Sequence, residues 1–218
     1  MNIGKQCDLQ VNKSVYVVDD SAEMRRSLHK LFGAMGIDAF PFRSGCDFLD
    51  RIDDLKPAPI LMDIRMPDID GLELMGELRR RAKTWPVIVI TAHGEVPIAV
   101  RAMRLGAIEF LSKPFEMGEL EGALDMAFDA LQDRATEERD RNAALARLAS
   151  LTQREREIVN RLATGLSNKE IARELDLSVR TVEMHRANAM RKLQTGNVVG
   201  LVALMAVVEG GRTAIGHA

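Results

Sequence analysis

The stretch ILMDIRMPDIDG, residues 60–71, joins an apolar run to a turn rich in acids. The run predicts a short buried strand, and the Met-Pro pair predicts a loop directly after it. Asp63 stands between the two, where a carboxylate needs a partner because burial of an unpaired charge is costly. The function of Asp63 is therefore the first question that the sequence raises.

Four similar apolar runs accompany this one within the first 128 residues. The five runs are SVYVV (14–18), DAFPF (38–42), PILM (59–62), VIVI (87–90) and IEFL (108–111). Apolar residues recur at helical spacing between them, as in Met24, Leu28, Leu31, Phe32 and Met35. Strands that alternate with helices require right-handed crossovers, so we predict an α/β doubly wound, five-stranded parallel sheet.

Polar side chains stand where these strands end, and ligands bind at the carboxyl ends of strands in parallel sheets. Asp19 and Asp20 follow the first run, Asp63 the third, Thr91 the fourth and Lys113 the fifth. Three carboxylates in one cleft repel one another unless a cation is present, and Mg²⁺ accepts such ligands together with a phosphate oxygen. A hydroxyl and an ammonium suit a transferred phosphoryl group. We therefore predict that Asp63 is a nucleophile that becomes an aspartyl phosphate.

Four segments resemble the landmarks of response-regulator receiver domains in order and spacing. They are VVDDS (17–21), LMDIRMPDIDG (61–71), VIVITAHG (87–94) and EFLSKPF (109–115). The resemblance covers about residues 14–130 and implies a flavodoxin/CheY-like fold. It also implies that a sensor histidine kinase donates the phosphoryl group to Asp63.

The same resemblance implies a role for each residue of the site. Mg²⁺ would be held by Asp19, Asp20, Asp63 and the backbone carbonyl of Arg65. Thr91 and Lys113 would contact the phosphoryl oxygens, and Phe110 takes the place of the aromatic switch residue. Ala92 is small and would leave the phosphoryl group open to water. The Lys113–Pro114 peptide bond would be cis, a state that X-Pro bonds can adopt.

Two other readings of the acidic turn fail on single residues. An EF-hand loop with Gly71 at its sixth position would place the sulfur of Met66 at the first ligand, with Pro67 beside it. A haloacid-type phosphatase would need an aspartate two residues after the nucleophile, where Arg65 stands.

Composition restricts the setting of the protein. The formal net charge is −2, with 46% hydrophobic and 28% charged residues, which suits packed cores. The N-terminal residues lack the apolar stretch of a signal peptide, and the apolar segment 198–208 is about half a membrane span. Cys7 and Cys46 make no metal cluster or disulfide framework, and His29 and His93 lack metal spacing. We expect a cytoplasmic protein without a membrane partner.

The remaining chain predicts a helical linker over 129–150 and an all-α module over 151–218, after a receiver domain over 1–128. Two capping boxes pair Thr152 with Glu155 and Ser167 with Glu170. Gly165 suits the end of a helix, and a tight break at 177–178 precedes helices over 179–193 and 198–208. Short helices joined by tight turns are typical of a helix-turn-helix module. The net charge rises from −4 over 1–128 to +3 over 151–218, which weakly favours a polyanionic partner for this end.

The segment LTQREREIVNRLATGLSNKEIARELDLSVRTVEMHRANAMRKL (151–193) resembles a LuxR-type helix-turn-helix. Together with the receiver landmarks it resembles the FixJ/NarL group of transcription regulators. Exposed residues at helical spacing would enter a major groove, and the resemblance implies base contacts from Glu183, Met184 and Ala187. Phosphate contacts would come from Lys169, Arg180, Thr181 and Arg191.

These patterns predict a two-component response regulator rather than an enzyme. Phosphorylation of Asp63 is expected to release or dimerise the module that binds double-stranded DNA at inverted repeats, through a homodimer surface at 96–110. RNA polymerase is considered as a further partner. The rival reading is a phosphate sink or adaptor whose C-terminal helices bind protein rather than DNA. A second rival is a metal-dependent phosphohydrolase, which would turn over phosphomonoesters.

Overall fold

The computed structural model describes residues 13–92 and 96–213, so Cys7 and His93 lie outside the described part of the chain. The chain divides into two compact units, Met1–Asp133 and Arg134–Ala218. Helix α5 (Met117–Ala149) begins in the first unit and ends in the second. Among the described helices, none combines the length and the apolar character needed to cross a membrane.

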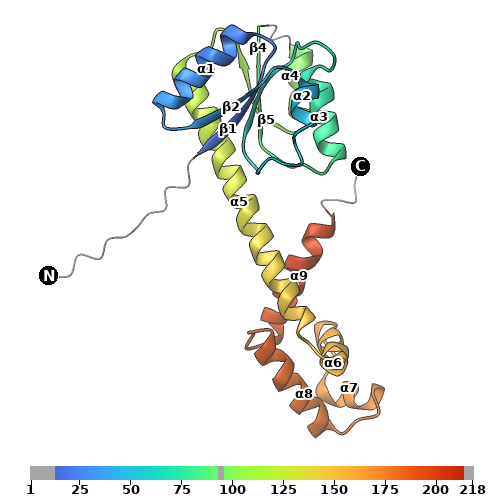
Figure 1. Ribbon diagram of the computed structural model, residues 1–218. Helices are drawn as coiled ribbons and strands as arrows, with labels where there is room; N and C mark the ends of the chain where they lie inside the picture. The colour runs from blue at the N-terminus through green and yellow to red at the C-terminus, as the bar shows by residue number, and fades with distance from the viewer. Residues whose placement is uncertain (1–12, 93–95, 214–218) are drawn as a thin grey trace, which may run out of the picture. The chain divides into compact units, whose positions relative to one another are not determined.

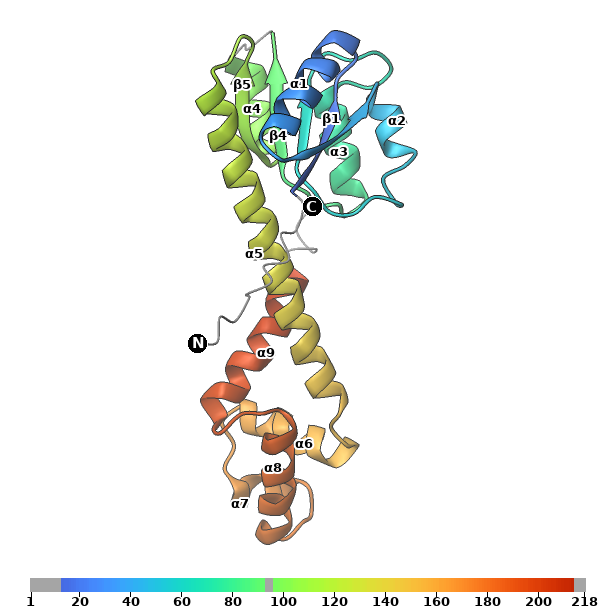
Figure 2. The same ribbon diagram turned by 60° about the vertical axis from the view of Figure 1, so that its left-hand side comes forward.

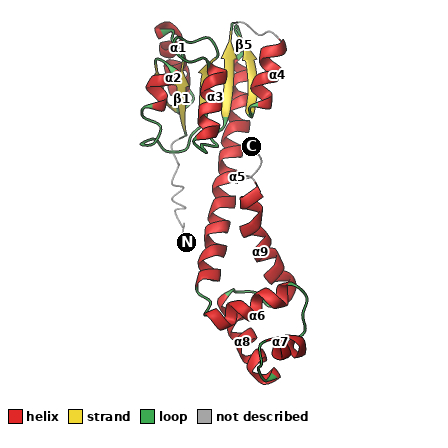
Figure 3. Cartoon of the chain, turned by 90° about the vertical axis from the view of Figure 1, so that its right-hand side faces the viewer, coloured by secondary structure: helices red, strands yellow, loops and turns green. Residues whose placement is uncertain are grey.

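The first unit contains a five-stranded sheet in which all strands are parallel, as predicted (Figures 1, 2 and 3). The strand order is β2-β1-β3-β4-β5, which places the three strands β1, β3 and β4 in the middle. The strands are β1 (Ser14–Val18), β2 (Asp38–Phe42), β3 (Ile60–Asp63), β4 (Val87–Thr91) and β5 (Ala107–Ser112). The helices before α5 are α1 (Ala22–Ala34), α2 (Gly45–Leu49), α3 (Gly71–Arg80) and α4 (Val96–Arg104).

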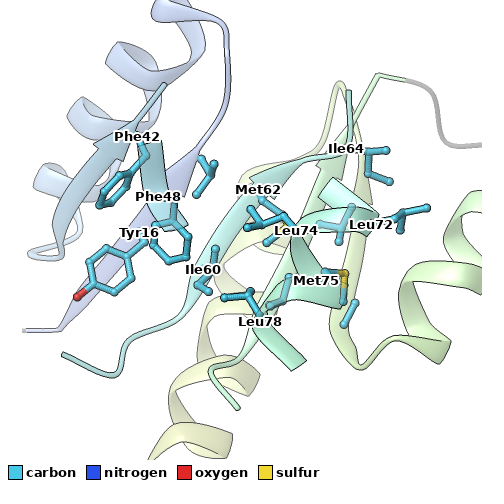
Figure 4. Close-up of a cluster of buried hydrophobic side chains, with 14 of the residues drawn as sticks. Tyr16, Phe42, Phe48, Ile60, Met62, Ile64, Leu72, Leu74, Met75 and Leu78 are labelled. Atoms are coloured by element: carbon cyan, nitrogen blue, oxygen red, sulfur yellow. The ribbon is translucent and has the colours of Figure 1, made fainter. Parts of the chain in front are cut away.

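Alternate side chains of each central strand enter two separate cores, because successive residues of a strand point to opposite faces. Ile60 and Met62 of β3 meet Leu74 and Leu78 of α3 in a cluster that also contains Tyr16 (Figure 4). Leu61 of the same strand joins the other cluster, with side chains from α1 and α5. The helices thus cover both faces of the sheet, as a doubly wound fold requires.

The helix starts of the first unit are encoded locally. The Ser21 hydroxyl accepts from the Met24 N–H at the start of α1, and Asp70 and Glu73 form a capping box at the start of α3. The short helix α2 was not predicted, since its five residues are too few to show a helical period. Its Ser44 cap, which accepts from the Asp47 N–H at 3.1 Å, was the available signal.

Over the described residues of the second unit, helices joined by short loops are the regular elements, without strands (Figure 3). After α5 it contains α6 (Gln153–Ala163), α7 (Asn168–Glu174), α8 (Val179–Lys192) and α9 (Val198–Thr213). Both predicted capping boxes form, and Gly165 has a φ of +89° after the end of α6. Helix α9 extends to Thr213, five residues beyond its predicted end.

A single core joins the helices of this unit. Its fully buried members include Ile158 and Val159 of α6, Ile171 of α7, Val182 of α8 and Leu201 of α9. Seven apolar residues of α7, α8 and the turns beside them lie in or against this core. They are Ile171, Leu175, Leu177, Val182, Ala189, Met190 and Leu193.

Candidate functional site

Three carboxylates meet at the carboxyl end of the sheet. Asp19 and Asp20 directly follow β1, and Asp63 is the last residue of β3. One oxygen of each lies within 4.8 Å of the others, although the three come from sequence positions up to 44 residues apart. Asp19 is fully buried, whereas Asp20 is exposed and Asp63 is partly exposed. The cluster is therefore anchored in the protein on one side and open to solvent on the other.

Lys113, just after β5, bridges two of these carboxylates. Its Nζ lies 2.6 Å from Asp63 Oδ2 and 3.0 Å from Asp19 Oδ2. Burial acts to lower the pKa of Lys113, but hydrogen bonds to Asp63 and Asp19 and the charges of both carboxylates outweigh it, so this pKa lies above its usual value. The side chain thus remains an ammonium at neutral pH and offsets part of the repulsion within the cluster.

Backbone groups fix the orientation of the acids. Asp19 Oδ1 accepts from the Ser21 N–H at 2.7 Å, and its carbonyl accepts from Arg25 Nη1 at 2.6 Å. Asp63 Oδ1 accepts from the Arg65 N–H at 3.2 Å. The carboxylates of Asp19 and Asp63 are thus each held at one oxygen by the loop that follows the strand, while the other oxygen faces Lys113.

The remaining predicted residues lie on β4 and β5 or directly after these strands. Thr91 ends β4, is 1% exposed, and its carbonyl accepts from the Lys113 N–H at 2.8 Å. Ala92 is exposed, and Phe110 is half-buried on β5, against the core that contains Met62. The Lys113–Pro114 peptide bond is cis, as the resemblance implied. Residues from the ends of β1, β3, β4 and β5 therefore form one site.

The donor set of this site fits a hard divalent cation. Three carboxylates supply oxygen ligands only, and the exposed position of Asp20 leaves room for water. Mg²⁺ favours oxygen ligands and retains several of its waters, so the chemistry of the cluster agrees with the predicted metal.

A second candidate surface lies on α8. Five residues at helical spacing on α8 form a stripe that is exposed at every position, with Met184 at 53% exposure. The stripe consists of Arg180, Glu183, Met184, Ala187 and Arg191. Thr181 is half-buried, and its N–H and hydroxyl contact the Ser178 hydroxyl at 3.0 and 2.7 Å. Lys169 is exposed near the start of α7.

Several contacts in the two units were missed from the sequence. Arg25 reaches the Asp19 carbonyl, Arg186 of α8 donates to Asn168 of α7 at 3.1 Å, and Lys192 pairs with Glu155. Arg25 stands four residues after the Ser21 cap, which offered a weak local signal. The other two contacts link residues on different helices, and no sequence pattern predicts them.

Comparison with known proteins finds two family matches along the chain. The family model of the response regulator receiver domain matches residues 15–125, and that of bacterial regulatory proteins of the luxR family matches residues 149–205. The transcriptional regulatory protein FixJ of Bradyrhizobium diazoefficiens is 42% identical over 190 residues, which cover 87% of this chain and 93% of FixJ.

Two solved structures extend this similarity over most of the chain. A low-resolution structure of the response regulator StyR has a TM-score of 0.77 and 35% identity, with 89% of this chain and 98% of StyR covered. Full-length FixJ from B. japonicum has a TM-score of 0.57 and 40% identity, with coverage of 91% and 98%. The chain belongs to the FixJ/NarL group of response regulators and is a DNA-binding transcription regulator with a receiver domain and a LuxR-type helix-turn-helix.

Proposed function

We propose that Asp63 is the phosphoacceptor through which a sensor histidine kinase controls this regulator. The observation that carries the proposal is the Asp63 carboxylate, held between the Lys113 ammonium at 2.6 Å and the Arg65 N–H, with oxygens of Asp19 and Asp20 within 4.8 Å. A carboxylate oxygen of Asp63 bonds to phosphorus while the phosphorus–nitrogen bond of a phosphohistidine breaks. The imidazole nitrogen retains the electron pair, and the product is an acyl phosphate.

Asp19, Asp20, Asp63 and the backbone carbonyl of Arg65 are proposed to hold Mg²⁺. When bound, this ion offsets the negative charge that gathers as a phosphoryl group approaches the carboxylates. Asp19 is the most constrained of the four, because its carboxylate and carbonyl both accept hydrogen bonds. We assign it the anchoring of the metal, and Asp20 the ligand on the solvent side.

Lys113 and Thr91 are proposed to contact the phosphoryl oxygens once the acyl phosphate has formed. The Lys113 ammonium already contacts Asp63, so a phosphoryl group on that carboxylate would lie within its reach. Movement of Thr91 towards the new charge would leave space that Phe110 can fill from the neighbouring strand, which is the proposed switch. The exposed Ala92 leaves a path for water and hence for hydrolysis of the acyl phosphate.

We assign sequence reading to the exposed stripe of α8. Glu183, Met184 and Ala187 would contact base edges, and Lys169, Arg180, Thr181 and Arg191 would contact phosphates. The exposed Val96, Val100 and Met103 of α4 support the proposed homodimer surface at 96–110. RNA polymerase is a further proposed partner. The cytoplasm is the proposed compartment, because the protein must meet the DNA there.

The proposed domains are a receiver over 1–128, a linker over 129–150 and a DNA-binding domain over 151–218. The output is DNA binding rather than turnover of a substrate, so we propose no enzymatic role. In a phosphate sink or adaptor, the exposed stripe of α8 would have no DNA to bind. We therefore rank this alternative function second.

Two variants test the phosphoacceptor. Asp63→Asn retains the shape of the side chain but removes the nucleophile, so acetyl phosphate should no longer raise the DNA affinity in a gel-retention assay. Asp68→Asn changes an exposed acid of the same loop, at a φ of 73° that asparagine tolerates, and should respond like the parent. A full response of Asp63→Asn would overturn the proposal.

A further inference from the structure

An ion pair between a buried carboxylate, Glu155, and a partly exposed lysine, Lys192, lies at the junction of helices in the second unit. Glu155 is 4% exposed and is, with Asp19, one of two buried acids among the described residues. Lys192 Nζ donates to Glu155 Oε2 at 2.6 Å, and the Thr152 N–H donates to the same oxygen at 2.8 Å. One carboxylate thus closes the capping box of α6 and also holds a lysine from another helix.

The pair joins the start of one helix to the end of another. Glu155 lies in the first turn of α6, and Lys192 is the last residue of α8, 37 positions later. Arg156 Nη2 donates to the Leu148 carbonyl at 3.3 Å, which ties α6 to the last turn of α5. Hydrogen bonds from the neighbouring residues Glu155 and Arg156 therefore connect the start of α6 both to the end of α8 and to the end of α5.

The charge state of the pair makes it sensitive to substitution. Burial acts to raise the pKa of Glu155, but hydrogen bonds from Lys192 and Thr152 outweigh it and leave the pKa below its usual value. Glu155 is thus an anion at neutral pH, and loss of Lys192 would leave a buried charge without its cation. Buried ion pairs contribute little net stability but can select one packing arrangement over others.

We propose that Glu155 and Lys192 are positioning residues for DNA reading, which fix α8 at one angle to α6 and to the last turn of α5. The inference rests on the proposed contact between the exposed stripe of α8 and DNA. Base-edge contacts need the stripe in one orientation, whereas phosphate contacts through long cations tolerate a tilt. A shifted α8 should therefore lose discrimination between DNA sequences more than overall attraction to DNA.

Three variants separate this role from a contribution to stability. Glu155→Gln retains the acceptor that the capping box needs but loses the charge that faces Lys192. Lys192→Met retains much of the apolar stem but loses the ammonium. The double variant removes both charges together, so it restores folding stability without restoring the link. Glu157→Gln is the matched control, since it removes a charge from the same helix in a more exposed pair with Arg154.

The measurement is the ratio of affinities for two DNA duplexes. Full-length protein treated with acetyl phosphate is titrated with a duplex that the parent selects from a random library, and with a scrambled duplex, over a range of salt. Helical circular dichroism confirms folding. Both single variants and the double variant should lose about tenfold in the affinity ratio, the size of one mismatched base pair. Glu157→Gln should retain the ratio of the parent.

Each other outcome is decisive. If the double variant regains both the stability and the affinity ratio of the parent, the pair has only a structural role. That result would overturn the inference. A salt slope lower by about one unit in Lys192→Met alone would make Lys192 a phosphate contact and also overturn it. A parent that never prefers its selected duplex would refute DNA reading by α8 itself, and the inference with it.

Discussion

A Cβ atom on Gly71 would lie 2.5 Å from the backbone carbonyl oxygen of Asp63 and 2.9 Å from Ile64 Cα. Both contacts are with backbone, which cannot rotate away as a side chain can. The first residue of α3 therefore packs directly on the strand end that presents Asp63, and only glycine allows this approach.

Gly71→Ala should push the Asp63 loop away from Lys113 and slow phosphorylation by acetyl phosphate by about tenfold to hundredfold, since small displacements of reacting groups are costly. The rate is measured by gel separation of the labelled protein. Gly76→Ala in the same helix is the control, because its new Cβ would meet nothing within 4 Å. Equal rates for the two variants would refute positioning by Gly71.

Lys113→Ala should separate phosphorylation from switching. Some phosphorylation should persist, because the carboxylates remain. Dimerisation should not follow, because no ammonium would draw the end of β5 towards the phosphoryl group. Sedimentation of the labelled protein measures this, with Lys13→Ala as a control whose ion pair with Asp125 is on the surface. Dimerisation of labelled Lys113→Ala to the extent of the parent would be evidence against the role.

Substitutions at the residues that follow α1 and α3 should change the free energy of unfolding in opposite directions. Gly36 after α1 and Ala82 after α3 both adopt left-handed backbone, with φ of 73° and 53°. Left-handed conformation is costly for a residue with a Cβ, so Ala82→Gly should raise the free energy of unfolding by about 0.5–1 kcal/mol, net of the greater freedom of unfolded glycine. Gly36→Ala should lower it by a similar amount.

Trp85 makes this change measurable in the first unit. It is the only tryptophan of the chain and stacks on Tyr16, with ring centroids 5.6 Å apart. Its fluorescence in urea titrations therefore follows unfolding of the sheet rather than of the helical unit. Destabilisation by Ala82→Gly would show that the backbone at this position is not left-handed in solution.

Glu183 and Arg191 should differ in how they affect DNA binding. A carboxylate that faces DNA is repelled by phosphate unless it accepts a hydrogen bond, and cytosine N4 supplies one. Glu183→Gln should alter the preference at one base pair per half-site, by about 1–3 kcal/mol. Arg191→Ala should weaken all sequences alike and reduce the salt slope by about one unit. An unchanged motif for Glu183→Gln in library selection would exclude base reading by this residue.

The proximity of the carboxylates and Lys113 could be predicted because parallel topology brings the ends of separate strands together. Asp19, Asp63, Thr91 and Lys113 each follow or end an apolar run, and parallel strands bring such positions to one edge of the sheet. The exposed stripe of α8 could be predicted for a related reason, since helical periodicity separates its faces. Both predictions needed only the local period and the order of elements.

Contacts between elements could not be predicted in this way. The five residues of α2 are too few to show a period, and the approach of Gly71 to Asp63 depends on the path of a loop. The pairing of Glu155 with Lys192 depends on how α6 and α8 pack, which no spacing encodes. Side chains that orient a site are therefore harder to read from the sequence than side chains that form it.

Chemical trapping of the acyl phosphate tests the central claim most directly. Full-length protein is treated with acetyl phosphate and Mg²⁺, reduced with borohydride, digested and analysed by mass spectrometry. An aspartyl phosphate at residue 63 should be converted to homoserine at that position, in an amount that approaches one per chain and falls when a chelator removes Mg²⁺. Homoserine at another aspartate, or stoichiometric labelling with residue 63 unmodified, would contradict the account.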